Sequence, residues 1–126
     1  MKTLSLLLAL CATAQAAPAA SFFRALHIVE TSGRTGPILG DGGKALGPLQ
    51  IHRSYHADAR IGGDYSRCAD LDYSRRVVSA YLQRYAPAAW AAGDVTTLAR
   101  IHNGGPRGAS KQATVNYAAK VARLTK

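Results

Sequence analysis

A glycine-rich segment directly after a helical stretch limits the folds open to this chain. Residues 31–45 contain five glycines and one proline, which permits a tight turn or a short hairpin but no helix. Before this segment, Phe22, Leu26 and Val29 have the i, i+4, i+7 spacing of one helix face. The sequence therefore predicts a first helix over 20–30, followed by a small glycine-rich loop or hairpin.

The remaining sequence is mostly helical in pattern. Each further predicted helix has a residue that suits its first turn or its N-cap. The predicted helices are 48–59, starting at Pro48; one capped by Asp70 or Asp72 and stopped by Pro87; 95–102, capped by Asp94; and one capped by Ser110. We therefore expect an α+β fold, mostly α, with about five helices.

The first 16 residues are typical of a secretory signal. Lys2 precedes an apolar run over 4–10, and Ala14-Gln15-Ala16 is an A-x-A cleavage pattern. The run is too short to span a bilayer. We expect cleavage near Ala17, a secreted or periplasmic protein, and one mature domain over 17–126.

Cleavage would remove Cys11 and leave Cys68 as the only cysteine. No intramolecular disulfide could then form, so packing alone must hold the mature fold. For a small exported domain this is unusual. Cys68 is either a buried apolar filler or a free thiol, and the sole tryptophan, Trp90, is expected to fill the core.

The net charge of +9 predicts attraction to polyanions such as an anionic cell-wall or membrane surface. The cationic residues are scattered, and no nucleic-acid-binding motif is present, so we expect no specific nucleic acid as partner. His52 and His56 have i, i+4 spacing but no convincing third ligand. We therefore expect no metal and no cofactor; the oligomeric state is left open.

Two carboxyl groups lie close to the glycine-rich segment. Glu30, the only glutamate, follows apolar residues near a helix C-terminus, where desolvation and the helix dipole both favour the protonated form. Such a group is suited to be a general acid. Asp41 follows in Gly40-Asp41-Gly42-Gly43, and glycosidases use two carboxyl groups. From spacing alone, two ordinary carboxylates remain an alternative.

Two clusters of polar residues and glycines, over 47–52 and 100–106, could bind a sugar polymer. In them Gln50, His102 and Asn103 are candidate sugar ligands, and His52 is a weaker one. His102 could instead pin its helix, and Asn103 could serve a left-handed turn. Tyr55 either stacks on a sugar or packs internally.

Several motifs, spread over about Leu26 to Val121, resemble those of the invertebrate-type (destabilase-like) lysozymes. They are Val29-Glu30-Thr31-Ser32-Gly33, Asp41-Gly42-Gly43, Gly47-Pro48-Leu49-Gln50-Ile51 and Arg100-Ile101-His102-Asn103-Gly104-Gly105-Pro106. The resemblance implies a lysozyme-like fold and hydrolysis of the β-1,4 bond between N-acetylmuramic acid and N-acetylglucosamine in peptidoglycan glycan strands. It also implies that Glu30 is the general acid and Asp41 the nucleophile or stabiliser.

The chain departs from that family in its cysteines, since Leu46 and Ala109 stand where cysteines usually flank the motifs. Two other functions remain open. The chain also resembles lytic transglycosylases, which use a glutamate alone and form anhydro-muramyl products. A non-enzymatic cationic wall-binding protein is the third reading. An Asp41 that lines a cleft opposite Glu30 would favour hydrolysis.

Overall fold

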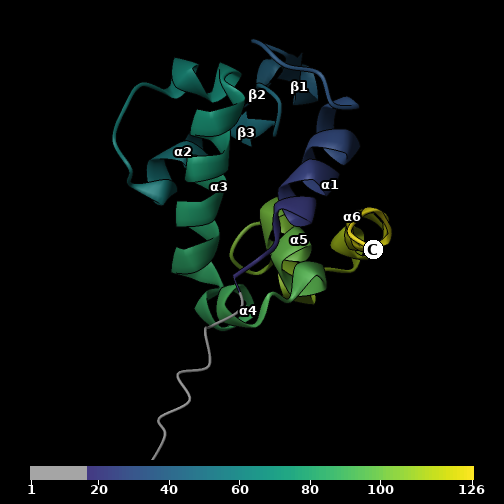
Figure 1. The fold of residues 1–126 in the computed structure, drawn as a ribbon. Helices are drawn as coiled ribbons and strands as arrows, with labels where there is room; N and C mark the ends of the chain where they lie inside the picture. The colour runs from purple at the N-terminus through teal and green to yellow at the C-terminus, as the bar shows by residue number, and fades with distance from the viewer. Residues whose placement is uncertain (1–16) are drawn as a thin grey trace, which may run out of the picture.

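A computed structural model describes residues 17–126, which form six α-helices and a small three-stranded sheet (Figure 1). The signal sequence expected over 1–16, with Cys11, lies outside the described residues. The helices are α1 (Ala20–Thr31), α2 (Arg53–Ala59), α3 (Leu71–Tyr85), α4 (Pro87–Ala92), α5 (Val95–Gly104) and α6 (Val115–Leu124). The strands are β1 (Leu39–Gly40), β2 (Ala45–Leu46) and β3 (Ile51–His52).

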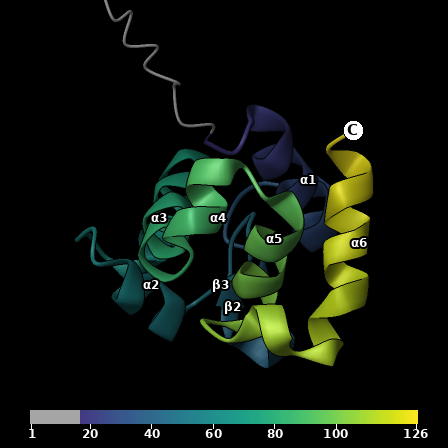
Figure 2. The same cartoon turned by 90° about the horizontal axis from the view of Figure 1, so that it is seen from below.

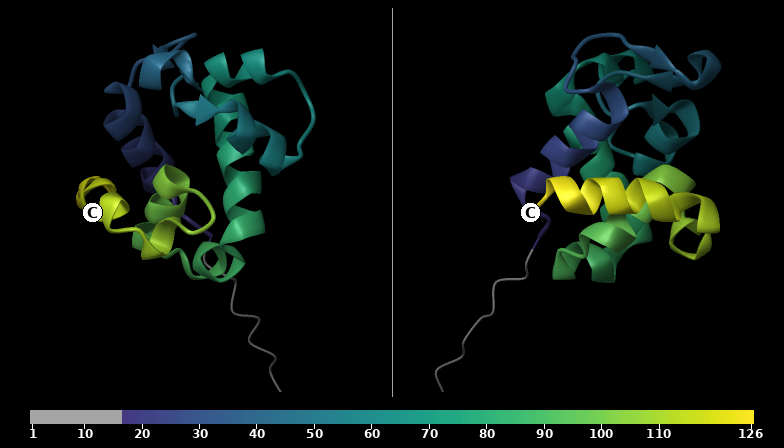
Figure 3. Two further views of the ribbon diagram at one scale, coloured as in Figure 1. Left: turned by 180° about the vertical axis from the view of Figure 1, so that it is seen from behind. Right: turned by 90° about the vertical axis from the view of Figure 1, so that its right-hand side faces the viewer.

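The sheet lies at one end of the molecule and α4 at the other, with α1 and α3 connecting the two ends (Figures 1 and 3). Seen from below, α6 runs beside α1 and α5 (Figure 2), and both helix pairs are in contact. Fully buried side chains from α1, α3 and α5 form the core, among them Phe22, Leu26, Val77, Leu82 and Leu98. Apolar packing therefore holds the domain together.

The predicted glycine-rich hairpin is present. Strands β1 and β2 pair antiparallel, with Gly40 opposite Ala45, and β2 pairs antiparallel with β3, with Ala45 opposite His52. The 3₁₀ turn η1 (Asp41–Gly43) joins β1 to β2. This topology places Asp41 at the turn and His52 two strands away, at the same end of the sheet.

The prediction that a helix begins at Pro48 is wrong. Residues 47–50 form a turn, β3 follows, and α2 begins only at Arg53. Gly47 has φ +84° and Gln50 has φ +52°, values that a right-handed helix excludes. A Cβ on Gly47 would lie 1.8 Å from the carbonyl oxygen of Cys68, so glycine is required there by a contact distant in sequence.

Two helix caps are confirmed and a third is wrong. The Asp70 carboxylate accepts a hydrogen bond from the backbone N–H of Tyr73, and that of Asp94 accepts one from Thr97. Ser110 instead lies in the 3₁₀ turn η3 (Gly108–Ser110), where its hydroxyl donates to the Arg107 carbonyl. A second short turn, η4 (Gln112–Thr114), follows, so α6 begins only at Val115.

Pro87 does stop α3, which ends at Tyr85, but it also begins the additional short helix α4. The fixed φ of proline suits a first helical position. On α4, the half-buried Trp90 packs edge-on against Phe23 with ring centroids 6.5 Å apart. Trp90 therefore closes the core from the end opposite the sheet.

Cys68 is completely buried, and burial raises the pKa of its thiol to about 11. It is therefore the apolar filler rather than a reactive thiol. No disulfide occurs within residues 17–126, where Cys68 is the only cysteine. In the same part of the chain, no helix is long and apolar enough to cross a membrane.

Candidate active site

A cleft of about 580 Å³ brings the sequence candidates together. All six residues proposed from the sequence line it, namely Glu30, Asp41, Gln50, Tyr55, His102 and Asn103. They come from α1, the β1–β2 turn, the turn before β3, α2 and α5. The cleft is also lined by Ser54, Asp58 and Tyr81, which had no assigned site role. Ser54 and Asp58 share one face of α2 at i, i+4 spacing, a signal too common to single them out.

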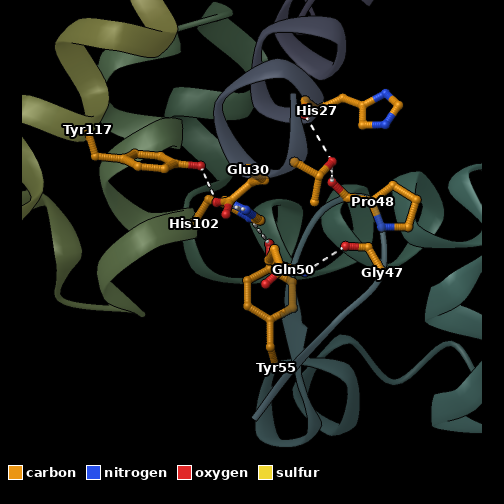
Figure 4. A network of polar contacts seen from close by, with 9 residues as sticks. His27, Glu30, Gly47, Pro48, Gln50, Tyr55, His102 and Tyr117 are labelled. Atoms are coloured by element: carbon orange, nitrogen blue, oxygen red, sulfur yellow. Dashed lines mark hydrogen bonds and ion pairs between the residues drawn. The ribbon is translucent and has the colours of Figure 1, made fainter. Parts of the chain in front are cut away.

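Glu30 lies in the last turn of α1, and its side chain is 17% exposed. Its Oε1 accepts a hydrogen bond of 2.6 Å from the Tyr117 hydroxyl and lies 3.5 Å from Nε2 of His102 (Figure 4). Among the described residues, Oε2 has no hydrogen-bond partner. One oxygen of the carboxyl group is therefore held by the protein and the other is available to a ligand in the cleft.

Tyr117 reaches Glu30 because α6 packs along α1. Burial raises the pKa of the Tyr117 phenol well above its usual value, and the adjacent Glu30 carboxyl raises it further. The phenol is therefore neutral near pH 7 and donates its proton to Oε1. Sequence reasoning missed this contact, which joins residues 87 positions apart. The available signal was weak: a buried phenol on an apolar helix stripe usually has a polar partner.

His102 is held from its other side by Tyr55. The Tyr55 hydroxyl lies 2.8 Å from Nδ1 of His102, and its ring stacks on Tyr81 with centroids 3.6 Å apart. Burial raises the pKa of Tyr55 well above its usual value, with smaller contributions from Tyr81 and Glu30. The tautomer that satisfies both contacts accepts from Tyr55 at Nδ1 and directs Nε2–H towards Glu30. Tyr55 is thus packed inside the protein and orients His102.

Asp41 lies in a more exposed environment than Glu30. Its side chain is 64% exposed, and Oδ2 lies 3.1 Å from Nε2 of His52. Its backbone has φ +51°, the left-handed region that aspartate and asparagine tolerate better than most residues. The glycine-rich turn therefore presents Asp41 as a solvated carboxylate in the cleft that also holds the shielded carboxyl group of Glu30.

Gln50 supports the loop that carries Asp41. Its Nε2 donates to the carbonyls of Ile38 at 3.1 Å and Gly47 at 2.9 Å. A Cβ on Gly40 would lie 1.8 Å from Oε1 of Gln50, so the amide lies directly over the hairpin backbone. The Thr31 hydroxyl donates to the Pro48 carbonyl at 2.9 Å, which ties the end of α1 to the same turn.

Asn103 is exposed at the end of α5. The left-handed turn suggested for it is wrong, because the positive φ of this region belongs to Gly105. The two histidines at i, i+4 spacing have separate partners, since His56 Nε2 lies 2.7 Å from the Tyr73 hydroxyl. Over residues 17–126, no group of three or more His, Cys, Asp or Glu side chains could hold a metal ion.

In sequence and in structure, this chain matches known lysozymes. No family model matches the chain. A lysozyme of Ostrea edulis is 39% identical over 76 residues, which are 58% of this chain and 55% of that protein. The chain thus spans about half the length of the curated relatives it matches first.

Solved structures match over more of the chain. Tapes japonica lysozyme superposes with a TM-score of 0.71 at 28% identity, over 86% of this chain and 94% of that one. Meretrix lusoria lysozyme, in a complex with Aeromonas hydrophila PliI, gives 0.71 at 26% identity over 85% and 90%. In sequence over part of its length, and in fold over most of it, the chain is therefore similar to the invertebrate-type lysozymes.

Proposed function

We propose that this protein is an exported lysozyme, with residues 1–16 as its signal and 17–126 as its catalytic domain. Its substrate is the β-1,4 bond between N-acetylmuramic acid and N-acetylglucosamine in peptidoglycan. The observation that carries the proposal is the pairing of two unlike carboxyl groups in one cleft, the shielded Glu30 and the exposed Asp41. The similarity to lysozymes supports the same reaction.

In the proposed reaction, Glu30 donates its proton from Oε2, because Tyr117 and His102 both engage Oε1. The proton goes to the glycosidic oxygen as its bond to the anomeric carbon breaks. Asp41 stabilises the positive charge on that carbon or bonds to it. Water then attacks, and Glu30 takes up the water proton, so that its carboxyl group is restored.

The remaining cleft residues differ in which of their polar atoms are available to bind a sugar. Asn103 is exposed and has no hydrogen bond among the described side chains, so its amide is the most available sugar ligand. Gln50 uses its Nε2 within the protein, which leaves Oε1 to accept from a sugar hydroxyl or amide. We assign Tyr55 and His102 to the support of Glu30, with any sugar contact secondary.

A lytic transglycosylase is the second candidate. One observation favours it. Asp41 is paired with His52 and largely solvated, whereas Glu30 is shielded and is held by Tyr117 and His102. In that reaction the muramyl 6-hydroxyl replaces water, and Glu30 alone moves the protons.

Mass analysis of peptidoglycan digests tests these functions directly. We expect the protein to release fragments with reducing muramyl ends. Anhydro-muramyl ends would assign the transglycosylase reaction, and absence of cleavage would indicate a non-enzymatic cationic wall-binding protein. A sample without protein is the control for spontaneous release of fragments.

Tyr117→Phe should lower kcat by about tenfold, the loss expected for one hydrogen bond of about 1.4 kcal/mol to a charged or reacting group. KM should stay within about twofold, since the phenol contacts Glu30 and does not line the cleft. Steady-state kinetics on soluble peptidoglycan fragments measure both. Tyr85→Phe, which removes the hydroxyl from a ring that packs against Tyr81, is the matched control and should keep the kcat of the unsubstituted protein.

Tyr117→Phe should also change how the free energy of unfolding depends on pH. Because burial raises the Tyr117 pKa, the folded state keeps a proton that the unfolded chain releases above about pH 10. Stability is therefore lost as pH rises through that range, by up to about 1.4 kcal/mol per pH unit for each such phenol. Tyr117→Phe should show a shallower loss in denaturant titrations between pH 9 and 11; an unchanged slope would contradict the assigned environment.

A further inference from the structure

A second hollow of about 330 Å³ adjoins the cleft. It is lined by Gly43, Lys44, His52, Arg53 and Ser54. His52 and Ser54 also line the main cleft, so the two depressions share a wall. A polymer bound in the cleft would thus have a side group within reach of this depression, which we call the cationic hollow.

The charges of the two depressions differ. The main cleft contains the carboxyl groups of Glu30, Asp41 and Asp58, whereas the cationic hollow has no acidic lining residue. Within residues 17–126 neither Lys44 nor Arg53 forms a salt bridge. The hollow therefore concentrates positive charge beside a cleft that is otherwise acidic.

Acidic neighbours are already engaged elsewhere. The Asp64 carboxylate accepts a hydrogen bond from the Ser66 N–H. The Ser66 side chain and this N–H lower the Asp64 pKa, and Arg53 adds a smaller effect. Asp41 faces His52 at 3.1 Å. Neither carboxylate lies within salt-bridge distance of Lys44 or Arg53.

The arginine of the hollow is also positioned. The Arg53 guanidinium lies 4.5 Å from the centroid of the Tyr65 ring, in cation–π contact. The Tyr65 hydroxyl donates to the Ile51 carbonyl at 2.6 Å, which fixes the ring against β3. The stacked guanidinium keeps its edge free, and that edge is the part that binds an anion in fork geometry.

We propose that the cationic hollow is a subsite for a carboxylate carried by the glycan in the cleft. This carboxylate belongs to the peptide stem, which is attached to the lactyl group of N-acetylmuramic acid. This proposal rests on the proposed function and adds to it a preference: the protein distinguishes peptide-bearing strands with free carboxylates from strands whose carboxylates are blocked. Guanidinium and ammonium groups suit this ligand because their hydrogen bonds to carboxylate are charge-assisted.

The test compares two forms of one substrate, peptidoglycan fragments with free stem carboxylates and the same fragments after chemical amidation. Phosphate-bearing polymers are removed from both. We expect kcat/KM to be about tenfold higher on the free form, a difference of about 1.4 kcal/mol that two solvent-exposed ion pairs can supply together. The variant Lys44→Gln/Arg53→Gln should lose most of that preference and cleave both forms at the amidated rate.

Lys120→Gln/Arg123→Gln is the matched control, because it removes the same net charge from exposed positions on α6. It should keep the preference. An equal loss in both double variants would assign the effect to long-range attraction and overturn the subsite. An unchanged preference in Lys44→Gln/Arg53→Gln, or a preference seen only before phosphate removal, would overturn it as well.

Binding of the two substrate forms to Glu30→Gln protein separates this proposal from the proposed function. If the unsubstituted protein cleaves neither form, the lysozyme assignment fails. The subsite still stands if Glu30→Gln protein binds the free form more tightly and Lys44→Gln on that background removes the difference. Equal binding of both forms would overturn the subsite regardless of activity.

Discussion

Glu30→Gln should reduce peptidoglycan cleavage by about 10³-fold, within the range of 10²–10⁴ that general acid–base catalysis contributes. The substitution replaces the carboxyl group that donates the proton in the proposed reaction with an amide that cannot act as an acid, and it leaves the size of the side chain almost unchanged. The amide oxygen can still accept from Tyr117, which donates at 2.6 Å to Oε1. The loss should therefore fall on kcat, and release of soluble muropeptides measures it.

The comparison needs evidence that the fold is intact. Thermal unfolding of Glu30→Gln should follow that of the unsubstituted protein closely, because the hydrogen bond from Tyr117 and the core packing of α1 remain. Asp72→Asn, which removes one negative charge from an exposed position on α3, is the matched control and should keep full activity. Cleavage by Glu30→Gln within tenfold of the unsubstituted rate would exclude Glu30 as the acid.

The parts of the fold that were predictable from sequence depend on local interactions. Asp70 and Asp94 cap helices through backbone N–H groups three residues away, and such contacts have a sequence signature. The start of α2 was not predictable in this way. Gly47 turns the chain because its α-carbon lies against the Cys68 carbonyl, a contact that only the folded chain contains.

The same division applies to the site. The two carboxyl groups and the polar clusters were identifiable from composition, motif spacing and family resemblance, and all six candidates do line one cleft. The supporting contacts were not identifiable. Tyr117 meets Glu30 across 87 residues and Tyr55 meets His102 across 47, so the packing of α6 on α1 and of α2 near α5 had to be known first.

Asp41→Asn should lower cleavage by about 10²–10³-fold, the cost of losing one electrostatic contact to the charge that develops in a transition state. Asparagine is the appropriate replacement because Asp41 has φ +51°, a conformation that asparagine adopts as readily. Its side-chain oxygen can also keep the contact with Nε2 of His52, now 3.1 Å from Oδ2. The variant therefore removes charge and nucleophilicity while the turn and its neighbour are conserved.

The outcome separates the two enzymatic readings, because they differ in what they require of Asp41. A hydrolase needs the second carboxylate at the anomeric carbon, so its rate must collapse in Asp41→Asn while substrate binding persists. A transglycosylase needs Glu30 alone, so Asp41→Asn would retain activity within severalfold and form anhydro-muramyl ends. His52→Gln is the control for the neighbouring contact, because it leaves the Asp41 carboxylate in place. If His52→Gln loses as much activity as Asp41→Asn, the reaction requires the histidine rather than the charge of Asp41.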